Sequence, residues 1–168
     1  MNAIVTLSHP LLAENGLELN VSRINLERLK HKYTASSEAE MNEVEWDKAE
    51  LEYRRFLSLK RLYPSIALVP SKQVDSIWHA HILDTRAYRS DCEQVFGRFI
   101  DHYPYFGIYG EEDQKELKHA FAETVALYEK HFGAYPGGGV ESQAMRCGDD
   151  HACHAPTSCA CRVPAACK

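Results

Sequence analysis

Apolar side chains recur at spacings of three and four along three long segments of the chain, residues 40–63, 72–96 and 112–132. This period gathers them on one side of an α-helix, whereas a half-buried strand would alternate every two residues. Helices with one apolar side need to bury it against a neighbouring helix. The pattern therefore predicts an all-α, mostly helical single domain of about four to five helices.

Capping residues, prolines and glycines mark the expected ends of these helices. Pro64 stops the first long helix, and Ser71 is a plausible N-cap for the next one. The second helical region is expected to break at Asp84, whose carboxylate can cap a new helix. Gly133 follows the last helix at the position that favours glycine. A shorter helix is expected to end near Tyr33.

Composition divides the chain into a folded body and a tail. Residues 1–21 show no sustained period and are expected to form an irregular N-terminal lead-in, and residues 22–136 are expected to form the helical domain. Residues 137–168 contain few apolar side chains larger than alanine. Such a segment cannot bury enough surface to offset its ordering entropy, about 1–2 kcal/mol per residue for the backbone. We expect this flexible Gly/Cys-rich tail to be disordered.

Charge and hydropathy exclude several classes of protein. The chain has 19 basic and 24 acidic residues, a net charge of −5, and no basic stripe for binding phosphates, which argues against a nucleic-acid partner. No apolar run approaches the roughly 20 residues of a membrane span. No Lys or Arg precedes the apolar residues of the N-terminus, as it would in a secretory signal. The expected location is cytoplasmic.

Three histidines and several aspartates are concentrated in two neighbouring segments. Asp75, His79 and His81 lie in one predicted helix, and His102 lies in an aromatic-rich loop further along the chain. Imidazole and carboxylate ligands suit zinc, iron and other divalent metals. Two histidines and one carboxylate with open positions form the facial arrangement of non-haem iron oxygenases. We predict a divalent metal site, zinc or iron, drawn from these four residues, with no reaction assigned.

Helix geometry restricts which of these residues can act together. On a helix His79 and His81 point about 160° apart and cannot share one metal ion, whereas Asp75 and His79 are four residues apart on one face. In a strand, His79 and His81 would instead share a face. The helix is favoured because the apolar stripe is longer than a typical strand. The third ligand beside His79 and His102 is Asp75 if the helix is unbroken, or His81 if the helix ends near that residue.

The same residues also fit a purely structural role. A histidine on an apolar stripe, as His81 is, often forms a core hydrogen bond to a carbonyl or carboxylate. Asp75 lies near the N-terminus of its helix, where an acidic group is favourable without any metal. In this interpretation the chain is a non-enzymatic interaction module, and the aromatic loop at residues 103–109 contacts a protein partner.

The cysteines suggest two further alternatives. Cys92 lies on an apolar stripe, where a free cysteine behaves as a small hydrophobe, although His81 or His102 as a nearby base would make it a nucleophile. The other five cysteines lie in the last 22 residues, with His151 and His154 between them. These thiols would suit copper(I) or zinc, or form disulfides in an oxidising compartment. Their spacing contains no C-x2-C pair, so it is not a zinc-ribbon pattern.

The central part of the sequence resembles the glycine-rich domain-containing protein-like family. That family has a V-D-x-x-W-H-x-H block, then an aromatic-Asp-Cys segment and a His-x-Pro loop, and the similarity spans roughly residues 22–136. The matching residues are Val74, Asp75, Trp78, His79, His81, Tyr88, Asp91, Cys92, Phe96, Gly97 and His102. The family's loop has two adjacent histidines, and here the first of these positions is Asp101. The resemblance implies a helical domain with a Gly- or Cys-rich tail and carries no reaction.

Overall fold

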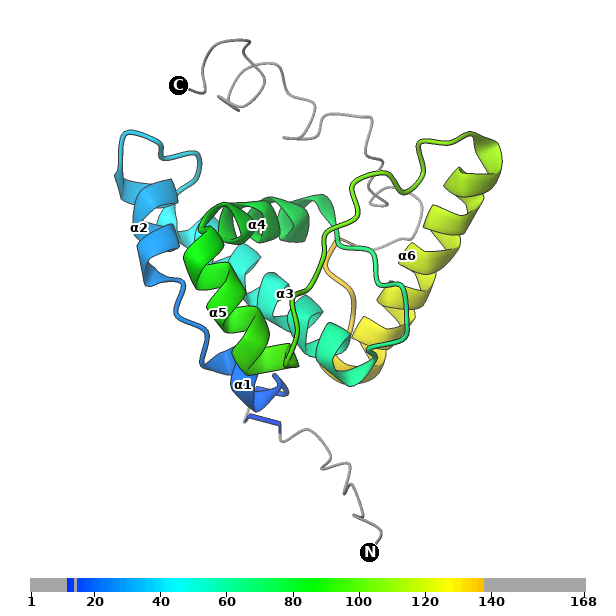
Figure 1. The fold of residues 1–168 in the computed structure, drawn as a ribbon, viewed down its shortest axis with the longest axis horizontal. Coiled ribbons are helices and arrows are strands. Elements are labelled where there is room, and N and C mark those ends of the chain that lie inside the picture. The colour runs from blue at the N-terminus through cyan, green and yellow to red at the C-terminus, as the bar shows by residue number, and fades with distance from the viewer. Residues whose placement is uncertain (1–11, 14, 138–168) are drawn as a thin grey trace, which may run out of the picture.

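The computed structural model describes residues 12–13 and 15–137, and this part of the chain is helical (Figure 1). It contains six helices and no strand, which confirms the predicted all-α class. The helices are α1 (Leu19–Ser22), α2 (Glu27–Ala35), α3 (Glu43–Leu62), α4 (Lys72–Leu83), α5 (Thr85–Phe96) and α6 (Glu111–Phe132). The tail at 138–168, with its cysteines, lies outside the described residues, so its expected disorder stays a prediction.

Helix α3 is the centre of the fold and contacts α1, α2, α4 and α6. It begins with a capping box, in which the Asn42 side chain accepts from the Glu45 N–H and the Glu45 side chain accepts from the Asn42 N–H. Its apolar stripe is buried throughout, with Trp46 and Tyr53 both 0% exposed. The stripe predicted from residue spacing is therefore the face on which most of the core is built.

Helices α4 and α5 follow each other directly, with a break at Asp84. The Ser71 side chain accepts a hydrogen bond from the Val74 N–H at the start of α4, and Asp84 accepts from the Ala87 N–H at the start of α5. Gly97 ends α5 in the left-handed conformation, with φ of 66°. These caps confirm the predicted boundaries. Because residues 72–83 are helical, the strand alternative for this segment is wrong.

Helix α6 packs beside α3 at the edge of the fold, and a long loop connects it to α5 (Figure 1). Its apolar face forms a second, smaller core with Val69 from the connection between α3 and α4. The Val69 N–H donates a 2.9 Å hydrogen bond to Thr124 Oγ1, which fixes that connection against α6. None of the described helices has an apolar stretch long enough to span a membrane.

The N-terminal segment is more ordered than expected from the sequence. A one-turn helix, α1, forms at the end of the predicted irregular lead-in and extends to Ser22, because the Glu18 carboxylate accepts hydrogen bonds from the Asn20 and Val21 N–H groups. Val21 is fully buried, and the Arg54 guanidinium of α3 donates to its carbonyl at 2.8 Å. Four residues are too few to show a helical period, so this turn depends on tertiary contacts that the sequence pattern does not reveal.

Candidate metal centre

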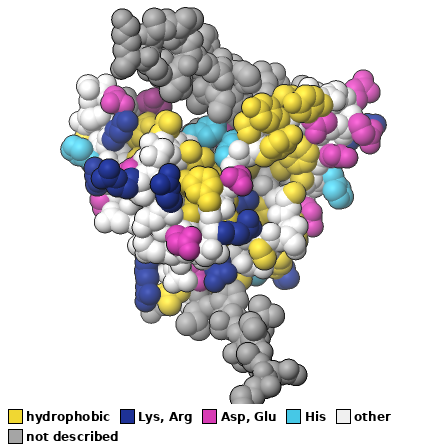
Figure 2. Space-filling model, viewed as in Figure 1, with side chains coloured by type: hydrophobic (Ala, Val, Ile, Leu, Met, Phe, Trp, Pro, Cys, Tyr) yellow, Lys and Arg dark blue, Asp and Glu magenta, His cyan; other side chains and the backbone are white. Residues whose placement is uncertain are grey.

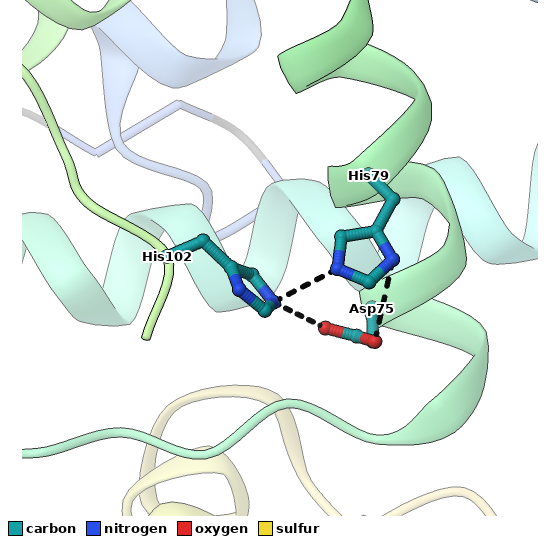
Figure 3. Close-up of side chains that lie close together, drawn as sticks. All are labelled: Asp75, His79 and His102. Atoms are coloured by element: carbon teal, nitrogen blue, oxygen red, sulfur yellow. Dashed lines mark hydrogen bonds and ion pairs between the residues drawn. The ribbon is translucent and has the colours of Figure 1, made fainter. Parts of the chain in front are cut away.

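Asp75 and His79 lie one turn apart on the same face of α4, and His102 reaches them from the loop that follows α5 (Figure 3). The Nε2 atom of His102 is 2.8 Å from Asp75 Oδ1 and 3.1 Å from His79 Nε2. The Nδ1 atom of His79 is 3.7 Å from Asp75 Oδ2. Three polar side chains separated by up to 27 residues in sequence therefore converge at one point.

The two distances from His102 Nε2, 2.8 Å and 3.1 Å, match those between neighbouring ligands of one metal ion. One ligand atom from each of the three residues lies within 4.8 Å of the other two. With metal–ligand bonds of about 2.0–2.2 Å, adjacent ligand atoms are about 3 Å apart. If no ion is bound, His102 Nε2 offers either one hydrogen or one lone pair, so it can satisfy only one of its two neighbours, Asp75 Oδ1 and His79 Nε2. The donor set of two imidazoles and one carboxylate, and its spacing, thus fit a divalent ion.

The loop that carries His102 is anchored by a hydrogen-bonded relay in the core. The Trp78 indole N–H donates to the Tyr88 hydroxyl at 2.9 Å, and that hydroxyl donates to the Ile100 carbonyl at 2.6 Å. The His102 ring also packs against Trp78, with ring centroids 4.7 Å apart. Trp78 is the residue before His79, so one residue of α4 positions the third member of the site.

His81 does not belong to this group of three residues. It is 1% exposed, and its Nδ1 and Nε2 atoms lie 3.0 Å from the Tyr53 hydroxyl and 3.0 Å from Asp91 Oδ2. The carboxylate can only accept, so Nε2 carries the hydrogen and Nδ1 accepts from Tyr53. Burial lowers the pKa of His81 and favours this neutral form. Of the four predicted ligands, the structure brings together Asp75, His79 and His102 and separates His81, as expected for a helix.

A family model described as UCP032817-like matches residues 18–129. The chain belongs to the UCP032817-like family. All three residues of the candidate centre lie inside the matched range. The boundaries predicted for the helical domain, residues 22–136, stay a prediction.

A short stretch of this UCP032817-like chain also resembles one curated protein. It is 47% identical over 36 residues to "Glycine-rich domain-containing protein 1" of Arabidopsis thaliana. The match covers 21% of this chain and only 4% of the length of that relative. No solved structure matches the chain. The resemblance to glycine-rich domain-containing proteins is therefore supported for a short segment and at the level of a family.

A pocket of about 350 Å³ lies beside the candidate centre of the UCP032817-like domain. Asp75 and His102 are among its lining residues, so two of the three converging side chains face this space. The other residues that line it are Lys60, Ala67, Leu68, Pro70, Trp78, Asp101, Tyr103 and Phe106. Asp101 also lines the pocket, and it is not in the converging group.

The alternative of a cysteine nucleophile is disfavoured by the surroundings of Cys92. Its side chain is 2% exposed, and burial raises the pKa of the thiol. The thiolate is the nucleophilic form, so this shift opposes nucleophilic chemistry. Both ring nitrogens of His81, one of the two candidate bases, already have partners in Tyr53 and Asp91.

Sequence reasoning did not assign two residues that matter to the site. Lys60, from the last turn of α3, lines the pocket, and Tyr88 anchors the loop. Tyr88 was named as a match to the resembled family, and its hydroxyl contacts depend on tertiary packing. Lys60 was only one of several basic residues near a helix end, where cations are common without any site.

Proposed function

We propose that the chain binds one divalent transition metal ion, zinc or iron, through Asp75, His79 and His102. The observation that carries this proposal is the convergence of one oxygen and two nitrogens, with distances of 2.8 Å and 3.1 Å from His102 Nε2. Asp75 is 4% exposed, and a buried carboxylate needs a compensating charge or hydrogen bonds. A divalent cation held by two imidazoles and this carboxylate would supply that charge.

The proposed centre has the character of a reactive site more than of a structural one. Structural zinc sites are usually closed by four protein ligands, whereas catalytic sites use three and leave a position open. Among the residues that the structure describes, three side chains converge here, and two of them line a pocket. A bound ion would act there as a Lewis acid or, if it is iron, would support oxidative chemistry. Asp75, His79 and His102 hold the ion, and the pocket admits the ligand that it acts on.

The proposal is tested by metal analysis of the full chain and of variants that each remove one ligand. The protein is stripped with a chelator under reducing conditions, reloaded separately with zinc and with iron(II), and analysed for bound metal by elemental mass spectrometry. We expect His102→Ala, His79→Ala and Asp75→Asn each to lose one ion per chain relative to wild type. His31→Ala and His119→Ala, at exposed positions, are the matched controls and are expected to lose none.

The cysteines of the tail need a separate control, because thiols bind zinc and copper(I) on their own. A variant with serine at positions 147, 153, 159, 161 and 167 keeps the body unchanged. If that variant retains one ion per chain, and loses it with His102→Ala, the ion belongs to the body. If wild type and His102→Ala hold the same amount of metal, the proposed centre is wrong. If only the serine variant loses metal, binding by the tail is the better explanation.

A second candidate function is an interaction module that contacts a protein partner through residues 103–109. Its support is an apolar surface in this loop: Tyr103, Tyr105, Ile108 and Tyr109 are 64%, 50%, 41% and 71% exposed. Figure 2 shows apolar side chains gathered on this face, with histidine side chains beside them. Patches of this kind often mark contact sites. If this second function is correct, a chelator should leave the melting temperature unchanged. If the protein binds a metal ion, the chelator should lower the melting temperature.

A further inference from the structure

Lys60 brings a positive charge into the pocket beside the candidate centre. It comes from the last turn of α3, and its ammonium lies 5.4 Å from the centroid of the Trp78 ring and 5.5 Å from that of Phe56. The ion pairs found among the described residues do not include Lys60. Two aromatic faces therefore hold the ammonium in place without neutralising it.

The surroundings of Lys60 are unfavourable for an isolated cation. Burial, and then repulsion from Arg98, lower the pKa of Lys60 from its usual value of 10.5. A partly desolvated ammonium without a carboxylate partner gains free energy when an anion is bound next to it. The pocket thus contains a cation that is already oriented and that lacks a counter-ion within the described part of the protein.

The remaining charges of the pocket limit the kind of anion that fits. Asp75 and Asp101 both line the pocket and carry negative charge. A divalent ion at the proposed centre and Lys60 would together carry three positive charges, against two negative charges on these carboxylates. That excess matches a monoanion, whereas a phosphate dianion would be repelled by Asp101 without full compensation.

The rest of the lining is mostly apolar, and Tyr103 is its one further polar side chain. Ala67, Leu68 and Pro70 come from the connection between α3 and α4, and Phe106 comes from the loop before α6. The volume of about 350 Å³ is near the lower end of the range for small-molecule pockets. These walls suit a compact hydrocarbon or aromatic group and provide few hydrogen-bond partners for a long polar chain.

We propose that this pocket binds a small organic carboxylate, whose negative charge is bound by Lys60 and the metal ion and whose apolar body packs against Trp78 and Phe106. The inference rests on the proposed metal function, because the ion supplies the second positive charge. It adds the class of ligand, which the three converging side chains alone do not specify.

Benzoate is the probe, and benzamide is its neutral counterpart of the same shape. Binding of each to the metal-loaded full chain is measured by titration calorimetry, with metal content determined for every sample. We expect benzoate to bind about ten-fold or more tightly than benzamide, as a charge-assisted contact would give. We expect inorganic phosphate to bind more weakly than benzoate. Equal affinities for benzoate and benzamide, or tighter binding of phosphate, would overturn the inference.

Variants of the pocket distinguish the effect of its charge on ligand affinity from the effect of its shape. Lys60→Gln should reduce the preference for benzoate, because only the metal ion then attracts the carboxylate, and Lys60→Arg, which keeps the charge, should retain it. Lys115→Gln is the matched control, because Lys115 is an exposed lysine on α6 whose side chain is 70% exposed. Ala67→Phe fills the pocket without changing its charge and should weaken benzoate and benzamide alike. Affinities are compared among samples of equal metal content and equal helical circular dichroism.

The two proposals fail in different ways. A chain that takes up no metal in its body contradicts the proposed function. A metal-loaded chain that does not distinguish benzoate from benzamide contradicts only the ligand class. An unchanged preference for benzoate in Lys60→Gln also contradicts this inference and leaves the metal centre intact.

Discussion

The Tyr88 hydroxyl donates a 2.6 Å hydrogen bond to the backbone carbonyl of Ile100, two residues before His102. The same hydroxyl accepts from the Trp78 indole at 2.9 Å. One buried side chain thus connects the helix that carries Asp75 and His79 to the loop that carries His102. The position of the third ligand depends on this connection as much as on His102 itself.

Removing that hydroxyl should therefore weaken both folding and metal binding. Tyr88→Phe leaves the Trp78 N–H and the Ile100 carbonyl without their partner, which costs about 1–3 kcal/mol. We expect this loss in the free energy of unfolding measured with urea, and a lower metal affinity in a competition titration. Tyr109→Phe, at a side chain that is 71% exposed, is the control and should change neither quantity. Full metal affinity in Tyr88→Phe would show that the loop is held by other contacts.

His81 should matter for stability and not for metal. His81→Leu keeps much of the side-chain volume but leaves the buried Tyr53 hydroxyl unpaired, so we expect a loss of about 2–4 kcal/mol in the free energy of unfolding. Adding Tyr53→Phe removes the unpaired hydroxyl and should recover part of this loss in a double-mutant cycle. Metal stoichiometry, measured on the folded variant, should stay as in wild type. A lost ion in His81→Leu would place His81 back among the ligands.

His131, near the end of α6, should contribute to the pH dependence of stability. Its Nε2 atom is 2.8 Å from the Tyr63 hydroxyl, and burial, then repulsion from Lys130, lower the pKa of His131 below its usual 6.5. The unfolded chain therefore binds a proton at higher pH than the folded chain does. Acidification through pH 6.5 down to the folded pKa should favour unfolding.

The measurement compares urea unfolding at about pH 7.5 and about pH 5.5, on either side of the unperturbed histidine pKa. His131→Gln should lose less stability over this interval than wild type. His119→Gln, an exposed histidine on the same helix, should keep the wild-type dependence. If wild type and His131→Gln lose the same amount of stability between these pH values, His131 does not contribute to the pH dependence.

Gly107 permits the close approach of the loop to α6. Its φ is 85°, and a Cβ added there would lie 2.6 Å from Leu117 Cδ2. Gly110 has a similar φ of 96° with nothing within 4 Å of an added Cβ. Both substitutions to alanine carry backbone strain of about 1–3 kcal/mol, and only Gly107→Ala adds a clash with a buried leucine. We expect Gly107→Ala to lower the melting temperature more than Gly110→Ala, and equal effects would refute this reason.

The parts of this protein that were predictable are those set by local geometry. The spacing of four residues places Asp75 and His79 on one face, and the spacing of two separates His79 from His81, whatever surrounds the helix. The caps at Ser71 and Asp84 were recognisable because a side-chain oxygen satisfies a nearby N–H group within three residues. For these features, the two interacting groups lie within four residues of each other in the sequence.

The remaining features depend on partners that are distant in sequence. The sequence left the third ligand undecided between His81 and Asp75, because the answer depends on where His102 lies. Tyr53, 28 residues away in sequence, is the partner that engages His81 in the core. Lys60 reaches the pocket only because α3 and α4 pack together. None of these arrangements has a periodic signal, since each arises from the packing of one element on another.

Two groups of the candidate centre are fixed by a single turn of α4, whereas the third arrives only when the loop docks on that helix. A compact intermediate with intact helices and loose side-chain packing would keep Asp75 and His79 together and release His102. Losing one ligand of three would weaken metal binding steeply, so metal release would accompany the loss of tertiary packing and precede the loss of helical content. A bound ion would therefore link α4 to the loop that carries His102, and release of the ion would indicate that native side-chain packing has been lost.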